Sequence, residues 1–213
     1  MPHSLFYGEY RENRQYSYKD RSNLAAIRVT DIDDSLEWFG NYSERGETPI
    51  ILIPKRSSCA PYVYVPEGTY AVITKHGKFD SIQREGGLAI CLPWTQIQFL
   101  VTQQNITYKF PVRACPTYDN IFVALDIAVV FRCKPDDDSI FNFCYRISIN
   151  QLNEQLEAAI TERVRVLIRG KTHLEVYQIK GKTNTQEMKD FLNGMFGSKG
   201  LEFMDIIVTE VLL

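Results

Sequence analysis

The chain has 213 residues, of which 45% are hydrophobic and 23% charged, and its formal net charge is −2. This length and composition are those of a folded protein with one large domain or two small ones. The small negative charge, without a long basic stretch, excludes a general attraction to nucleic acid.

The cysteines indicate the redox state of the compartment in which the protein resides, and the hydropathy indicates how the chain can contact a membrane. The cysteines are odd in number and form no CxxC pair, which favours a reducing compartment over a disulfide framework. No apolar run approaches the roughly 20 residues that a membrane-spanning helix needs. We therefore expect any membrane contact of this chain to be peripheral.

Residues 1–48 are expected to form a polar extension without regular secondary structure. Tyrosines alternate with arginines and lysines up to Arg21, and an acidic and apolar stretch follows over residues 31–39. Neither part has the period of a helix or a strand. Two interpretations are open: a docking arm that orders on a partner, or an extension folded over its own domain.

Residues 49–115 are expected to form a small antiparallel β subdomain. Short segments rich in β-branched and aromatic residues alternate with turn residues, which is typical of antiparallel strands. The predicted strands are residues 50–53, 62–65, 70–74, 88–92, 95–102 and 106–112. Glycine and proline mark the turns at Pro66–Gly68, Gly77 and Gly86–Gly87.

A longer strand is predicted at residues 121–131, because apolar residues occupy every second position. The apolar face carries Ile121, Val123, Leu125, Ile127, Val129 and Phe131. The opposite face is mixed and includes Asp126 and Arg132, which indicates a central strand with a core on one side and thinner cover on the other. We interpret Asp126 as a solvated or paired carboxylate at the rim rather than as a catalytic group.

After this strand the apolar period becomes helical. One stripe on a helix of about five turns carries Leu152, Leu156, Ala159, Ile160, Val164, Leu167 and Ile168. Ser148 and Gln151 predict a capping box at its start, and Gly170 predicts its end. Glu157 lies off the stripe, so its replacement is expected to be nearly neutral, whereas replacement of Leu156 or Ile160 is not.

Two further helices and a strand complete the second half. Thr172 and Glu175 predict another capping box, which opens a short helix up to Gly181. Asn184 or Thr185 is expected to cap a third helix, which ends at Gly197, and residues 201–213 read as a final strand. Residues 116–213 are therefore predicted to be an α/β subdomain with helices packed on a sheet, and the whole chain to be α+β.

The sequence contains no motif that requires an enzyme. The histidines His3, His76 and His173 have no cysteine or carboxylate at ligand or catalytic spacing, so no metal site is expected. The glycines of Gly194–Gly200 lack the phosphate-loop spacing and lie between a helix and a strand, and no GxSxG motif is present. We expect no catalytic residue, no metal and no cofactor.

Three blocks of sequence resemble the SPFH or band 7 family, whose members include stomatin, prohibitin and flotillin. The blocks are Val65–Phe79 with Gly86–Trp94, then Thr117–Pro135, then the amphipathic helix with His173–Tyr177 and Gly200–Leu213. They cover about residues 60–213 in the order of the family. Gly86 and Ala89 depart from the proline and histidine that the family often has there, and the first 48 or so residues match nothing in it.

The resemblance implies an SPFH fold and a non-enzymatic scaffold subunit on the cytoplasmic side of a membrane. It implies side-by-side assembly with other SPFH-type subunits, as homo- or hetero-oligomers, with no nucleic-acid partner. In the family a long helix after the last strand drives assembly, and Leu213 lies where that helix would begin. We therefore expect either a piece of a longer protein or a short member that works as a module.

The alternative function is a soluble structural module of a large protein shell or cytoskeletal assembly. Such a module would use the same domain without lipid contact, and the tyrosine- and arginine-rich extension would be its docking element. A helical continuation rich in alanine and glutamate would favour the ring-forming scaffold over this alternative.

Three sets of residues are predicted to carry these functions. Lipid contact is expected at Ile50, Ile51, Leu52, Ile53, Leu92, Pro93 and Trp94, with core packing as the competing interpretation. Acylation is considered at Cys59, for which an ordinary buried thiol is the competing interpretation. Contacts with neighbouring subunits are expected at Tyr118, Asp119, Asn120, Glu154, Arg163 and Arg165.

Overall fold

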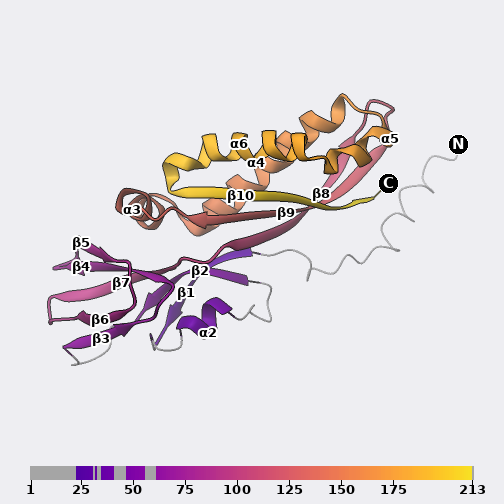
Figure 1. Ribbon diagram of the computed structural model, residues 1–213. Helices are drawn as coiled ribbons and strands as arrows, with labels where there is room; N and C mark the ends of the chain where they lie inside the picture. Colours follow the sequence, from indigo (N-terminus) through magenta and orange to yellow (C-terminus); the bar gives the residue numbers. More distant parts are fainter. Residues whose placement is uncertain (1–22, 31, 33–34, 41–46, 56–60, 213) are drawn as a thin grey trace, which may run out of the picture.

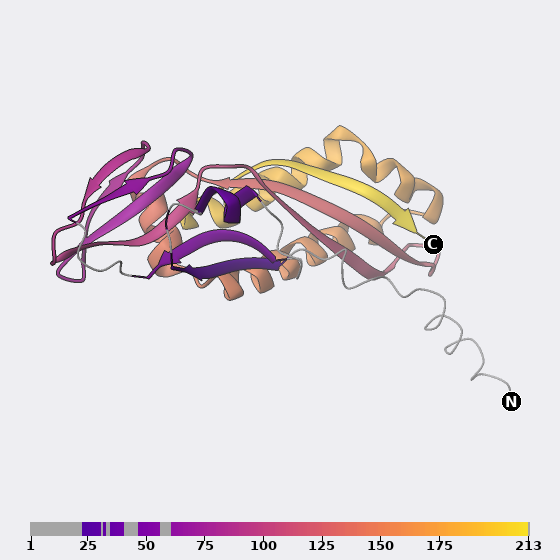
Figure 2. The same ribbon diagram turned by 90° about the horizontal axis from the view of Figure 1, so that it is seen from below.

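The computed structural model describes residues 23–30, 32, 35–40, 47–55 and 61–212. The molecule is elongated, with two β-sheets arranged end to end (Figures 1 and 2). One sheet has the strand order β1-β2-β7-β4-β5, the other has the order β10-β9-β8, and β3 pairs with β6 in a separate ribbon. Helices pack on the second sheet, so the predicted α+β fold class is confirmed.

The strands follow the predicted pattern of short segments between turns. The first sheet contains β1 (Asn23–Val29), β2 (Glu47–Pro54), β4 (Thr69–Lys75), β5 (Lys78–Gln83) and β7 (Thr95–Thr102). The ribbon contains β3 (Tyr62–Val65) and β6 (Gly87–Ile90), and the second sheet contains β8 (Ile106–Pro116), β9 (Phe122–Cys133) and β10 (Leu201–Leu212). β7 belongs to the first sheet and β8 to the second. The chain therefore passes from one sheet to the other before residue 115, where the subdomain boundary was expected.

The first part of the chain corrects one prediction. Residues 1–48 were expected to lack regular structure, yet β1 pairs in parallel with β2, and the short helix α2 (Ser35–Gly40) lies between them in the chain. The sequence of β1 does not show the alternation of apolar and polar residues that is typical of a strand. Only Leu24 and Val29 are buried, and a register shift between Ala25 and Ala26 interrupts the alternation. Pairing with β2, rather than local pattern, selects this strand. Residues 1–22 of the predicted docking arm, which was expected over residues 1–48, lie outside the described residues.

Both faces of the first sheet are buried. On one face Ile51, Val72 and Val101 belong to the main core, which continues into the second half of the molecule. On the other face Leu52 and Leu100 are opposite each other in the β2–β7 register and belong to a second core cluster. The ribbon covers that second face, since its residues Val65 and Ala89 are in the same cluster.

The second sheet agrees with its prediction except at Ile121, which precedes β9 and is 38% exposed. β9 is its central strand, and Val123, Leu125, Ile127, Val129 and Phe131 are buried on the predicted apolar face. The opposite face is only partly covered, and Arg132 there forms an ion pair with Glu202 of β10, 2.8 Å between Nε and Oε2. Asp126 is half-buried on this face.

The helices cover one face of the second sheet, with α4 (Ile149–Arg169) and α6 (Lys182–Phe196) lying over its strands (Figure 1). The predicted stripe of α4 is buried apart from Leu167, which is partly buried. Ser148 occupies the N-cap of α4 without a side-chain hydrogen bond, and Gly170 is the C-cap. The helix was therefore predicted correctly, but the hydrogen bond from its N-cap side chain, which the predicted capping box requires, is absent.

The remaining helices differ from prediction at their starts. The capping box of α5 (His173–Val176) is present, and the Thr172 N–H donates to Glu175 Oε2 at 2.9 Å. α6 begins at Lys182, before the expected cap at Asn184 or Thr185. α3 (Asp137–Arg146) was not predicted, although the Asp136 carboxylate accepts from the Ser139 N–H as an ordinary N-cap.

Helix α3 joins the two halves of the molecule. Phe79 of β5 packs edge-on against Phe141 with ring centroids 5.1 Å apart, and Phe99 of β7 does the same against Tyr145 at 5.4 Å. The Arg84 guanidinium pairs with Asp137 at 2.8 Å. Aromatic packing of this kind holds the first sheet against α3 and thereby fixes the position of the first sheet relative to the second.

Candidate functional site

The ribbon formed by β3 and β6 presents apolar side chains to the outside. Tyr62 is opposite Ile90 and Tyr64 is opposite Leu88, so all four side chains lie on one face of the ribbon. Their exposed fractions are 51% for Tyr62, 62% for Tyr64, 55% for Leu88 and 67% for Ile90. We call this surface the ribbon face.

The ribbon face contributes nothing to the core, because the opposite side of the ribbon does that. Val65 and Ala89 are buried, and Val63 is partly buried against the same cluster as Leu52 and Leu100. The inner residues therefore fix the ribbon on the first sheet. A contiguous set of exposed apolar side chains that folding does not require is typical of a surface that meets a partner or a membrane.

Close backbone packing holds the base of the ribbon. A Cβ added at Gly86 would lie 2.8 Å from both the N and the Cα atoms of Glu67, so only glycine allows the loop before β4 to approach this closely. Gly87 has a φ of 140°, which also favours glycine. These glycines fix where the chain enters β6, and thereby where Leu88 and Ile90 point.

The loop after β6 extends the apolar surface. Leu92 is 39% exposed and Trp94 is 46% exposed, and Pro93 between them is also exposed. The Trp94 carbonyl accepts a hydrogen bond from the His76 N–H at 2.8 Å. The loop is thereby attached to the tip of the β4–β5 hairpin.

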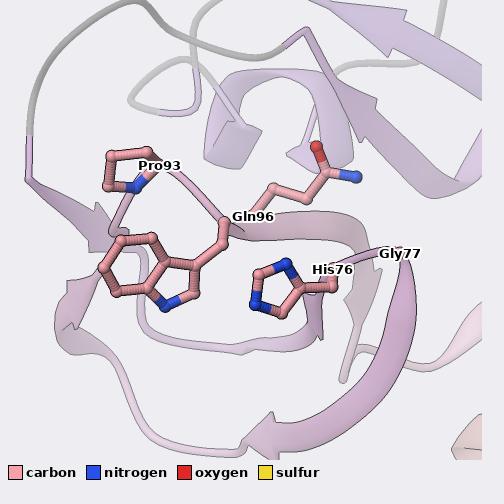
Figure 3. A pocket seen from close by; sticks show the side chains of 5 residues that line it. His76, Gly77, Pro93 and Gln96 are labelled. Atoms are coloured by element: carbon pink, nitrogen blue, oxygen red, sulfur yellow. The ribbon is translucent and has the colours of Figure 1, made fainter.

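An open pocket of about 380 Å³ lies between this loop and the hairpin, lined by His76, Gly77, Pro93, Trp94 and Gln96. In Figure 3 the side chains of His76, Pro93 and Gln96 surround it. The imidazole of His76 and the indole of Trp94 lie nearly parallel, with 6.3 Å between ring centroids and 11° between planes. The imidazole and the indole thus give the pocket both apolar ring faces and ring nitrogens that can form hydrogen bonds.

The residues predicted to contact lipid separate into two groups. Ile50, Ile51 and Leu52 are 1%, 3% and 0% exposed, so their predicted lipid contact is wrong, and they pack in the core. The reason is that both faces of the first sheet are covered. Ile53 is partly buried against the main core, whereas Leu92, Pro93 and Trp94 are exposed.

Sequence reasoning missed the ribbon face. The stretch Tyr62–Val65 alternates aromatic and β-branched residues, so both of its faces are apolar and the pattern does not tell which one is covered. The available signal was that Tyr62, Tyr64, Leu88 and Ile90 occupy alternate positions of two short strands. Their register brings these positions together, and the register depends on tertiary structure.

The turn predicted to contact other subunits lies at the opposite end of the molecule, beside α5 (Figure 1). Tyr118 is 75% exposed, and its N–H donates to the Lys171 carbonyl at 2.9 Å. Asp119 Oδ2 accepts from the His173 N–H and lies 3.1 Å from His173 Nδ1. Asn120 has a φ of 58°, a left-handed conformation that asparagine tolerates.

Exposed apolar residues of α5 and the turn after it enlarge this surface. Leu174 is 69% exposed and Tyr177 is 47% exposed, next to the tethered turn that carries Tyr118. We call Tyr118, Leu174 and Tyr177 the distal patch.

The three charged residues of α4 predicted to contact neighbouring subunits do not all lie on one face of the helix. Glu154 and Arg163 are nine positions apart, which places them about 180° apart around a helix. Arg163 is directed at α6, where its Nη2 lies 3.4 Å from Glu187 Oε2 and its guanidinium lies 5.6 Å from the Phe191 ring centroid. Arg165 is directed at β8, where it opposes the rise that burial causes in the pKa of Cys115. Arg163 therefore lies off the face that carries Glu154 and Arg165, which are eleven positions apart, close to the same side of the helix, and both exposed.

The thiols of Cys133, which is buried, and Cys144, which is half-buried, are not reactive. Burial raises the pKa of Cys133 to about 12 and also raises the pKa of Cys144. Thiols in this state are protonated near neutral pH and are poor nucleophiles. The predicted acylation site Cys59 lies outside the described residues.

The described residues provide neither a metal-binding cluster nor a membrane-spanning helix. Within those ranges, no three histidine, cysteine, aspartate or glutamate side chains gather as metal ligands. No helix in that part of the chain is long and apolar enough to cross a membrane.

Comparison with known proteins identifies the family. No curated protein matches the sequence in a direct comparison. The model of the SPFH domain / Band 7 family matches residues 63–213, well over half of the chain. The match includes the ribbon apart from Tyr62, the pocket, the second sheet and its helices. This protein therefore belongs to the SPFH domain / Band 7 family.

Proposed function

We infer that this protein is a non-enzymatic scaffold subunit that touches a membrane peripherally through the ribbon face and the loop Leu92–Trp94. The observation that carries the proposal is the ribbon face itself, with four apolar side chains each more than half exposed on one face. Family membership supports the scaffold class.

The composition of this surface suits a bilayer interface. Tyrosine and tryptophan are enriched where membranes meet water, because one end of each ring is apolar and the other can form hydrogen bonds. Tyr62, Tyr64 and Trp94 supply such rings, and Leu88 and Ile90 supply aliphatic surface. Full burial of one large apolar side chain stabilises by about 1.5–3 kcal/mol, so partial insertion of several gives weak, reversible binding per subunit.

Assembly would convert weak binding into stable attachment. Several subunits held side by side bind one membrane at high effective concentration, which multiplies a modest affinity. The ribbon face and the distal patch lie at opposite ends of the molecule (Figure 1), so a subunit on the membrane keeps Tyr118 and Leu174 free for SPFH-type neighbours. The free cysteines favour the cytoplasmic side of that membrane.

The test uses Trp94 as a reporter of membrane contact. Trp38→Phe leaves Trp94 as the one tryptophan, since the chain contains two. Its emission should move to shorter wavelength when vesicles are added, and lipids brominated in the acyl chains should quench it. Ile90→Ser should weaken the affinity for vesicles about ten-fold, by removing an apolar side chain worth roughly 1.5 kcal/mol at the interface.

The matched control is Val166→Ser, at a comparably exposed aliphatic residue of α4 outside both the ribbon face and the distal patch. It should leave vesicle binding unchanged. Binding that Ile90→Ser leaves intact, or no quenching by any vesicle, would refute membrane contact at the ribbon face.

The second function, a soluble module of a protein shell or cytoskeletal assembly, draws its support from the distal patch. Tyr118, Leu174 and Tyr177 form an apolar surface suited to a protein partner. Self-association that depends on Leu174, together with absence of vesicle binding, would favour this alternative.

A further inference from the structure

The tip of the β4–β5 hairpin, which borders the pocket, is built from an unusual set of residues. His76 and Gly77 form a two-residue turn in which both φ values are positive, 51° and 76°. Such turns match the twist of a hairpin, but asparagine and glycine are their usual residues. Lys75 and Lys78 flank the turn and are directly opposite each other in the strand register.

This arrangement concentrates positive charge at an exposed point. Like charges directly opposite on neighbouring strands destabilise a sheet. Lys75 and Lys78 are both exposed, and within the described part of the chain neither has an ion pair. The nearest acidic residue in sequence, Asp80, accepts a hydrogen bond from the Ser81 hydroxyl at 3.3 Å. An anion bound between the lysines would remove their repulsion.

The pocket beside the lysines offers hydrogen-bond donors and an apolar wall. The Trp94 indole N–H has no acceptor among the described residues, and the His76 imidazole lies parallel to that indole. One N–H of the Gln96 amide is bonded to Gln98, with 2.9 Å between Nε2 and Oε1, so its second N–H and the ring N–H groups are the donors that can face a ligand. Pro93 and the ring faces form the apolar part of the lining (Figure 3).

The position of this pocket decides which anion fits. Trp94 follows the ribbon by only a few residues, and the His76 N–H joins the hairpin tip to the Trp94 carbonyl. A bilayer that meets the ribbon face therefore brings its headgroups to the level of the pocket. Phosphate oxygens of those headgroups are acceptors for ring N–H groups and counter-ions for lysine.

We propose that the pocket between His76 and Trp94, with Lys75 and Lys78, binds the phosphate of an anionic phospholipid headgroup. The ribbon face supplies apolar contact with any bilayer, and this pocket selects membranes with a negative surface. The inference rests on the membrane contact proposed above and adds the class of lipid to it.

The expected size of the effect follows from membrane electrostatics. A lysine close to an anionic membrane surface strengthens binding about five-fold, and the gain falls as salt rises. Lys75→Gln with Lys78→Gln should therefore weaken binding to anionic vesicles by roughly 25-fold. Binding of the same variant to neutral vesicles should change little.

The experiment compares vesicles of phosphatidylcholine alone with vesicles that also contain phosphatidylserine, using Trp94 emission in the Trp38→Phe protein. Lys189→Gln is the control, because it removes one positive charge from α6 in the other half of the molecule. His76→Asn tests the imidazole, since asparagine tolerates the positive φ of this position. We expect a loss with anionic vesicles for the lysine pair and for His76→Asn, and none for Lys189→Gln.

The outcomes separate this inference from the function on which it rests. Equal binding to neutral and anionic vesicles, unchanged in the lysine variant, overturns the headgroup site and leaves membrane contact intact. Absence of binding to either kind of vesicle overturns membrane contact itself. Inorganic phosphate alone, without vesicles, should change Trp94 emission weakly; a response as strong as that to anionic vesicles overturns the lipid as the source of the phosphate.

Discussion

The hydroxyl of Tyr108, near the start of β8, donates a hydrogen bond to Glu157 Oε1 of α4 at 2.9 Å. Tyr108 is 0% exposed, so its hydroxyl lies inside the protein and requires an acceptor there. Glu157 is half-buried and extends from the edge of the apolar stripe toward the sheet. A charged residue outside the helical stripe therefore satisfies a buried polar group of a different element.

This bond revises the expectation for Glu157. Glu157→Ala should lower the free energy of unfolding by about 1–3 kcal/mol, because it removes the acceptor of a buried hydroxyl. Glu157→Gln keeps an oxygen acceptor and should lose less. Urea unfolding at unchanged slope measures both. Glu154→Ala, at an exposed position of the same helix, should change stability by under about 0.5 kcal/mol, and an equal loss in both alanine variants would contradict the role of Glu157.

The apolar stripe of α4 gives a second stability prediction. Leu156 and Ile160 are both 0% exposed, so Leu156→Ala or Ile160→Ala should destabilise the protein by about 2–5 kcal/mol. Val166 lies on the same helix and is 55% exposed, so Val166→Ala should be nearly neutral. Denaturant midpoints decide, and comparable shifts at Val166 and Leu156 would mean that the helix packs by another face.

The turn before β10 gives a third prediction. Gly200 has a φ of 89°, and a Cβ there would overlap the main-chain carbonyl of Ser139 in α3. Gly200→Ala should therefore destabilise by about 2–4 kcal/mol, from backbone strain and overpacking together. Gly194 in α6 has open space around it, so Gly194→Ala should be neutral or stabilising by up to about 1 kcal/mol. Thermal unfolding of the two variants in parallel tests the difference, which a well-tolerated Gly200→Ala would disprove.

The contact of Asp119 with His173 gives a pH prediction. Hydrogen bonds from the His173 side chain and main chain hold the pKa of Asp119 below its ordinary value of 3.8. Because the folded-state pKa is the lower one, this group stabilises the fold above the unfolded pKa, and the effect is lost as pH falls through the folded value. Asp119→Asn should lower the melting temperature at neutral pH, and the gap from the wild type should close below pH 3.8. Glu154→Gln serves as the reference for an exposed carboxylate, and a gap that is constant over the whole pH range would contradict the assignment.

Assembly gives the last prediction. Exposed ion pairs contribute only about 0–1 kcal/mol each, less than the several kcal/mol of motional freedom lost on association. Residues 1–213 should therefore be monomeric or weakly dimeric at micromolar concentration, with the distal patch supplying any dimer contact. Sedimentation velocity should show that Leu174→Ser removes the dimer while Leu92→Ser, at the other end, does not. A discrete ring formed by residues 1–213 would show that the surface of this domain drives assembly alone.

Local patterns in the sequence determined much of the fold. The alternation of Val123 to Phe131 placed the central strand, the stripe from Leu152 to Ile168 placed the long helix, and Thr172 with Glu175 placed a capping box that is present. These features are readable because the period of an amphipathic element and the hydrogen bonds of its caps depend on neighbours in sequence. The blocks resembling the SPFH family extended this reading to the fold of the second half.

Tertiary structure alone decided which apolar surface faces outward. Ile50–Leu52 and Tyr62–Val65 are both short apolar strands in sequence, yet the first is covered on two faces and the second on one. The difference arises because a strand is buried by whatever sheet, ribbon or helix packs on it, and the pairing of Tyr64 with Leu88 is not encoded in either strand by itself. For the same reason Glu157 acquired a buried partner from β8, and the ribbon face became visible only when β3 and β6 were placed side by side.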